Sequence, residues 1–143
     1  MTKVDFYTLR QSQENDRLFF ACRLVEKAFN LGHRIYLHTD SAQSAEELDD
    51  LLWSFRPESF LPHALVGFEA DEDDDIPILI GYAGHYDGPR DLLINLSREL
   101  PPFHGEFQRI SEIVINDEQA KQISRQHWKQ YQEAGCELQH HDL

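Results

Sequence analysis

The stretch VDFYTLRQSQENDRLFFACRLVEKAFNLGHRIYLH, residues 4–38, decides the fold. It opens with a short apolar and aromatic run, Val4–Leu9, which predicts a strand, and it closes with a second such run, Arg34–His38. Between them apolar residues recur at helical spacing, and Gly32 supplies the stop. The helical face consists of Leu18, Cys22, Val25 and Phe29. A strand, a helix and a second strand in this order predict a parallel pair joined by a right-handed crossover.

The same alternation continues after residue 38. Asp40 is positioned to cap a second helix, with Gln43 at the reciprocal capping position. The predicted inward face of this helix consists of Ala45, Leu48, Leu52 and Phe55. Beyond it, three short strands are expected within residues 60–67, 77–82 and 92–96.

The C-terminal third adds one strand and one helix. The run Ile110–Ile115 predicts the last strand, and Asn116 opens a helix that Gly135 ends, which leaves a polar tail. No repeat or linker interrupts the chain, so residues 1–143 are expected to form a single domain. We therefore predict an α/β fold, a three-layer Rossmann-like sandwich with a mostly parallel central sheet. The strand order within residues 60–96 stays open.

Composition narrows the classes of function. Twenty-six acidic residues against thirteen basic ones give a formal net charge of −13, which opposes direct binding of a nucleic acid backbone. No apolar run approaches the length of a membrane span, and the opening residues show no signal-peptide pattern. Two cysteines without a C-x-x-C spacing fit a reducing compartment. A cytoplasmic protein without membrane contact is therefore expected.

A Rossmann-like layout raises the alternative of a nucleotide-binding enzyme. Such enzymes cradle phosphates with glycine-rich loops, yet no glycine stands between the first predicted strand and helix, and the glycine cluster at residues 81–88 fits turns better. His140 and His141 lack the i, i+4 spacing of a metal pair, and Cys136 lacks a base with an orienting group. We therefore expect no catalytic residue, no cofactor and no metal.

The final predicted helix has two unlike faces. At about 100° per residue, one face suits burial and consists of Ala120, Ile123, His127, Tyr131 and Ala134. The opposite face gathers Lys121, Arg125, Trp128 and Lys129. A tryptophan is thus expected among cations and away from the core, a surface that suits an acidic peptide with an apolar or aromatic residue. The alternative is an ordinary solvated helix face.

The segment Trp53–His63 holds a second aromatic group. Apart from Phe55, which belongs to the inward face of the preceding helix, this segment holds Trp53, Phe60, two prolines and a leucine. Either this segment folds back on the core, or it offers an aromatic patch to a partner protein. The residues themselves leave both interpretations open.

Three parts of the chain together resemble the chi subunit family of the bacterial DNA polymerase III holoenzyme. They are Phe6–Tyr7 in the first strand, then Leu48–Asp49, Leu52–Trp53 and Glu58–His63 in and after the second helix, and finally Lys121–Ile123, Lys129, Tyr131 and Ala134–Gly135 in the last helix. The order and spacing of these segments carry the resemblance through most of the chain.

The resemblance implies a non-catalytic accessory subunit of the clamp-loader complex that acts in DNA replication. Such a subunit pairs with the psi subunit and binds the acidic C-terminal tail of single-stranded-DNA-binding protein. By position, the psi-facing residues are Phe60, Leu61 and Pro62, and the tail-binding residues are Lys121, Arg125, Trp128 and Lys129, with Trp128 standing where the family has tyrosine. The internal segment Asp73–Ile78 resembles that acidic tail, and we expect a solvated loop there, with mimicry of the ligand as the alternative.

Overall fold

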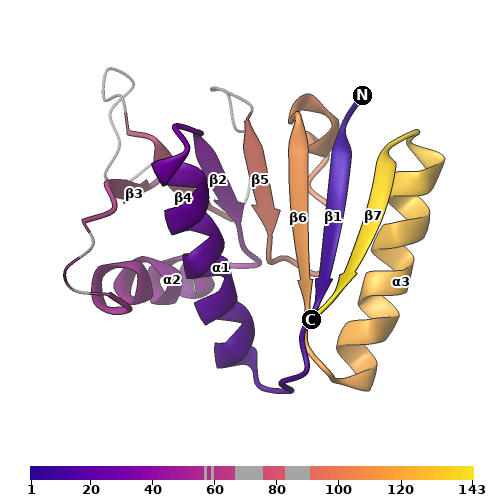
Figure 1. The fold of residues 1–143 in the computed structure, drawn as a ribbon, viewed down its shortest axis with the longest axis horizontal. Coiled ribbons are helices and arrows are strands. Elements are labelled where there is room, and N and C mark those ends of the chain that lie inside the picture. Colours follow the sequence, from indigo (N-terminus) through magenta and orange to yellow (C-terminus); the bar gives the residue numbers. More distant parts are fainter. Residues whose placement is uncertain (57, 59, 67–75, 83–90) are drawn as a thin grey trace.

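The computed structural model describes residues 1–56, 58, 60–66, 76–82 and 91–143. In this part of the chain, seven strands form one sheet of order β3-β4-β2-β5-β6-β1-β7, in which every neighbouring pair is parallel (Figure 1). The strands are β1 (Lys3–Thr8), β2 (Ile35–His38), β3 (His63–Leu65), β4 (Ile78–Gly81), β5 (Leu92–Asn95), β6 (Arg109–Val114) and β7 (Glu137–Asp142). The predicted α/β class with a parallel sheet is confirmed.

The described helices cover both faces of the sheet. They are α1 (Glu14–Asn30), α2 (Ala42–Ser54), α3 (Glu118–Glu133) and the 3₁₀ turn η1 (His104–Glu106). Helices α1 and α2 pack on the face to which Ile35 and Leu37 point. On the other face, where α3 and the η1 segment lie, Tyr36 packs against Phe103 (Figure 1). This alternation along β2 is that of a strand buried on both sides, and it gives the three predicted layers.

Helix α2 begins one residue later than predicted. The hydroxyl of Ser41 accepts a hydrogen bond from the backbone N–H of Ser44 at 3.2 Å, so Ser41 is the cap and the prediction of an Asp40 cap is wrong. The carboxylate of Asp40 instead accepts from the backbone N–H of Arg98 at 2.8 Å. The Asp40 carboxylate that the local pattern assigned to the helix cap is thus hydrogen-bonded to a residue far away in the sequence.

Strand β6 confirms the strand predicted at residues 110–115, but it is not the last strand, because the chain after α3 forms β7 where a polar tail was predicted. Gly135, with φ of 83°, ends α3 as predicted, and the following residues pair with β1. The buried carboxylate of Asp5 in β1 accepts hydrogen bonds from Arg109 Nε and His141 Nε2, each at 2.9 Å. These bonds hold β6, β1 and β7 together across one face. The sequence of β7, ELQHHD, contains one apolar residue and therefore gives no strand periodicity.

Strands β3, β4 and β5 lie within the three segments predicted for them. Gly81 ends β4 directly against the Tyr36 ring, and a Cβ at this position would meet the tyrosine hydroxyl and ring carbons. Residues 73–75 of the ligand-like acidic segment lie outside the described residues, as do the glycines between 83 and 90. No helix in the described ranges combines the length and apolar content that a membrane span needs.

Candidate protein-binding sites

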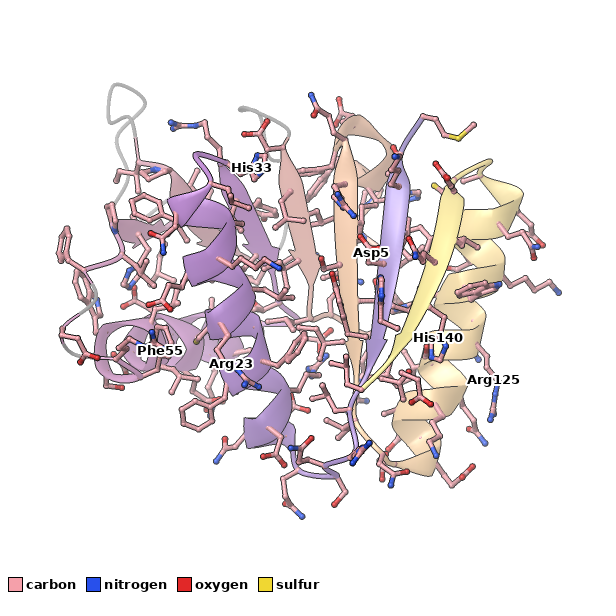
Figure 2. All side chains as sticks on the ribbon, in the orientation of Figure 1. Asp5, Arg23, His33, Phe55, Arg125 and His140 are labelled. Atoms are coloured by element: carbon pink, nitrogen blue, oxygen red, sulfur yellow. The ribbon has the colours of Figure 1, made fainter. Side chains whose placement is uncertain are left out.

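A hollow of about 220 Å³ opens between α3 and the strands beneath it. The eight described residues that line it are Phe6, Thr8, Val114, Lys121, Ser124, Arg125, Trp128 and His140. None of these eight is acidic, although the chain has a formal net charge of −13. Figure 2 shows that Arg125 comes from α3 and His140 from the neighbouring strand β7. The hollow therefore combines an apolar floor with a rim of basic side chains.

Trp128 contributes to the floor of this hollow. Its ring lies 5.1 Å from the ring of Phe6, centroid to centroid, and the side chain is half-buried. The prediction that Trp128 points away from the core is therefore wrong. Strand β7 widens the sheet beneath α3, so a broader arc of the helix contacts the sheet than a two-faced helix allows. The indole packs on the core while still lining the hollow.

The other three predicted tail-binding residues differ in whether they line the hollow. Lys121 and Arg125 line the hollow, while Lys129 is exposed on α3 outside its lining. His140 was not predicted as a site residue. Its Nε2 lies 2.8 Å from the hydroxyl of Thr8, and it reaches the hollow because β7 pairs with β1. The local sequence does not indicate the contact between Thr8 and His140, since neither of these residues belongs to a recognisable motif.

A buried hydrogen-bond network fixes α3 over the sheet. The carboxylate of Glu112 in β6 accepts from the Tyr131 hydroxyl at 2.6 Å and from the Asn95 amide at 2.8 Å. His127 Nδ1 lies 2.9 Å from the same carboxylate, and its Nε2 lies 2.7 Å from the carbonyl oxygen of Arg98. Burial lowers the pKa of His127, but the hydrogen bond and negative charge of Glu112 outweigh it, so the pKa is raised. The two buried side chains of α3, those of His127 and Tyr131, are thereby held in one orientation.

An aromatic pair stands exposed at the opposite edge of the sheet. Trp53, in the last turn of α2, is 51% exposed and Phe60 is 71% exposed. Their ring centroids lie 5.8 Å apart. The buried ring of His63 lies against Trp53, at 4.3 Å between centroids. We call Trp53 and Phe60 the aromatic pair.

The residues behind the aromatic pair belong to the core. His63 Nδ1 lies 2.6 Å from the carbonyl oxygen of Leu61, and its Nε2 lies 3.2 Å from the Asp49 carboxylate. Leu61 is 2% exposed and Pro62 is half-buried. The side chain of Leu61 is therefore buried in the core, and its place in the psi-facing set stays a prediction. Phe60 and Pro62 remain accessible.

A protein-family model covers nearly the whole chain. The family model described as DNA polymerase III chi subunit, HolC, matches residues 1–139. The chain belongs to the DNA polymerase III chi subunit family. The resemblance drawn from the sequence is thus confirmed, and family membership makes the protein a replication accessory subunit.

Three relatives bear the name DNA polymerase III subunit chi. The protein from Pseudomonas aeruginosa is 42% identical over 143 residues, which cover 100% of this chain and 98% of the relative. The protein from Haemophilus influenzae is 34% identical over 136 residues, covering 94% and 93%. The Escherichia coli protein is 27% identical over 143 residues, covering 96% of each.

A larger crevice of about 400 Å³ in this chi-family chain lies beside the carboxyl ends of β2, β5 and β6. Rossmann-like folds bind nucleotides at such a place. The charged lining consists of the carboxylates of Glu14, Asp40, Glu47, Glu112 and Asp117 and the guanidinium groups of Arg17 and Arg98. An excess of negative charge opposes a phosphate group, so this lining gives no support to the alternative of a nucleotide-binding enzyme.

The cysteines of the chi-family chain are poorly suited to nucleophilic chemistry. Burial raises the pKa of Cys22 to about 12 and also raises the pKa of Cys136, so both thiols are protonated at neutral pH. Among the described residues, no group of three His, Cys, Asp or Glu side chains is placed to hold a metal ion.

Proposed function

We propose that this chi-family protein is a non-catalytic adaptor of the clamp-loader complex, which joins the psi subunit to the acidic C-terminal tail of single-stranded-DNA-binding protein. The observation that carries the proposal is the hollow beside α3, whose eight described lining residues include Lys121, Arg125 and His140 and no acid. In an acidic protein, such a local reversal of charge marks a place where a negative ligand is favoured.

The hollow suits the end of an acidic peptide. An apolar terminal side chain can pack on the floor formed by Phe6, Val114 and Trp128, where burial of apolar surface supplies the affinity. The terminal carboxylate and the acidic residues before it then meet the basic rim. Because Glu112 and its partners hold α3 in place, little ordering of the protein accompanies binding.

The aromatic pair supports the second half of the proposal. Large exposed aromatic side chains are concentrated at interface hot spots, and Phe60 is 71% exposed while its neighbour Leu61 is locked in the core. Phe60 therefore precedes a residue anchored in the core, and its own side chain is available to a partner. We assign this surface to the psi subunit.

One calorimetric experiment tests the adaptor directly. The protein is titrated with an acidic peptide ending in Ile-Pro-Phe, and then with the same peptide ending in Ile-Pro-Ser. We expect saturable one-to-one binding of the first and at least tenfold weaker binding of the second, because the serine peptide lacks the apolar anchor. Psi added to the peptide-saturated protein should bind as it does to the free protein. Equal affinities for the two peptides would contradict the tail site, and competition between psi and peptide would contradict the adaptor.

A further inference from the structure

Helix α2 presents acidic side chains beside the aromatic pair. Glu46, Asp50 and Trp53 stand at positions i, i+4 and i+7 and so share one face of the helix. Glu46 and Asp50 are both exposed. Asp49, whose carboxylate meets His63, lies between them in the sequence. The face that carries Trp53 is therefore strongly negative.

Basic residues are absent from this element and its neighbourhood in the sequence. Between Arg34 and Arg56 the chain contains no lysine or arginine. Arg56 itself is paired with Glu26 of α1 at 2.9 Å. The carboxylates of Glu46 and Asp50 consequently lack a cation on their own helix, and their field extends into the solvent beside Trp53.

The aromatic pair is also pre-organised. His63 is fixed by Leu61 and Asp49 and lies under Trp53, and the insertion of Leu61 into the core turns Phe60 outward. A partner that covers these rings therefore orders few side chains, which favours a short anchored segment. Such a segment would contact the rings of the aromatic pair and, directly beside them, the carboxylates of Glu46 and Asp50.

From the charge and the rings together, we propose that the psi segment seated on the aromatic pair is a basic segment with an apolar anchor. The anchor packs on Trp53 and Phe60, and flanking lysine or arginine residues of the segment meet Glu46 and Asp50. This inference rests on the proposed psi site and adds the chemistry of its ligand. Oppositely charged partners associate faster and exclude like-charged competitors, so the acidic tail is rejected at this surface. The acidic edge at α2 thus binds a basic ligand, and the basic hollow at the opposite edge binds an acidic one.

The test uses the purified full-length psi subunit of the same organism as the probe. The affinity of psi is measured for wild type, for the α2 double variant Glu46→Lys/Asp50→Lys and for Phe60→Ala. The control is the double variant Glu133→Lys/Glu137→Lys, which makes the same change in net charge. Glu133 and Glu137 are exposed at the opposite edge of the sheet. We expect the α2 double variant to bind psi at least tenfold more weakly than wild type and to bind the tail peptide at least as well, while the control keeps its psi affinity.

The outcomes separate the inference from the adaptor. If Phe60→Ala no longer binds psi while the α2 double variant binds psi as wild type does, the inference of a basic psi segment is wrong and the proposed psi site is supported. If wild type fails to bind psi, or Phe60→Ala binds it fully, the psi site itself falls. Sedimentation of the protein alone checks for a second copy at this surface, and a dimer that Phe60→Ala converts to monomer would overturn the inference. Melting temperatures within a few degrees of wild type verify that each variant is folded.

Discussion

At the scale of single residues, Arg125 and Lys129 distinguish a binding site from an ordinary basic helix face. Both are exposed on α3, but only Arg125 lines the hollow. Reversing Arg125 to Glu should weaken an acidic tail peptide by well over tenfold, on the order of 1.4 kcal/mol or more, because it places like charge at the rim. The matched change Lys129→Glu should weaken binding less. Fluorescence of Trp128 during titration, with Trp53 replaced by Phe to remove the background, measures both.

Salt adds a second measure of the same site. The Debye length falls from about 10 Å at 0.1 M salt to about 3 Å at 1 M, so the contribution of the exposed rim should fall steeply while the apolar floor leaves residual binding. Equal losses for Arg125→Glu and Lys129→Glu would indicate a diffuse charge effect and speak against the hollow as the site.

His127 is the residue whose ionisation links the position of α3 to pH. Its pKa is raised because the hydrogen bond and charge of Glu112 outweigh its burial. A raised folded-state pKa means that protonated His127 stabilises the fold fully below the unfolded value of about 6.5, and that this contribution is lost as pH rises through the folded value. The difference in free energy of unfolding between wild type and His127→Ala should therefore shrink from pH 5.5 to pH 9. Urea titrations at both values measure it, and a constant difference would mean that the ring acts without its charge.

At the scale of elements, a side chain of β7 is hydrogen-bonded to a buried carboxylate of β1. The hydrogen bonds from His141 and Arg109 outweigh the effect of burial and lower the pKa of Asp5. Because its pKa is lowered in the folded state, ionised Asp5 stabilises the fold fully above its unfolded-state pKa of about 3.9. This stabilisation should be lost as pH falls through the folded-state pKa.

Replacing Asp5 by Asn tests that attachment. The change removes a charge that both neighbours contact at 2.9 Å, and it should lower the free energy of unfolding by about 1–2 kcal/mol at pH 7, a modest figure because the Arg109 side chain is 57% exposed. Urea denaturation measures the loss. Glu137→Gln, an exposed change in β7, is the control and should stay within about 0.5 kcal/mol of wild type. If the two variants lose equally little, β7 is held by its backbone pairing alone.

At the scale of the whole molecule, the two proposed sites occupy opposite edges of one sheet. Six strand spacings of about 4.8 Å separate β3 from β7, which places the edges roughly 29 Å apart (Figure 1). That separation exceeds the Debye length at physiological salt, so the charges of one site are largely screened from the other. Simultaneous occupation is therefore the expected behaviour of the adaptor.

Phe60→Ala tests the independence of the two edges. Truncating an exposed interface anchor should weaken psi by about 2 kcal/mol or more, whereas truncating a core phenylalanine would cost roughly 3–5 kcal/mol of folding stability. Since Phe60 is 71% exposed, we expect loss of psi binding with little change in melting temperature and with unchanged affinity for the tail peptide. Calorimetry and thermal denaturation of the same sample give both quantities. A collapse of the melting temperature would show that Phe60 supports the core.

The sequence by itself determined the α/β class, the strand–helix–strand unit of residues 4–38 and the basic character of α3, because these features follow from spacing within one element. The tertiary structure alone decided that β7 exists, that Trp128 packs on Phe6, that Leu61 is buried beside an exposed Phe60 and that His140 joins the hollow. Each of these depends on a contact between residues far apart in the chain. A polar strand such as β7 carries no periodicity of its own, and it forms because β1 offers an unpaired edge and Asp5 a partner for His141.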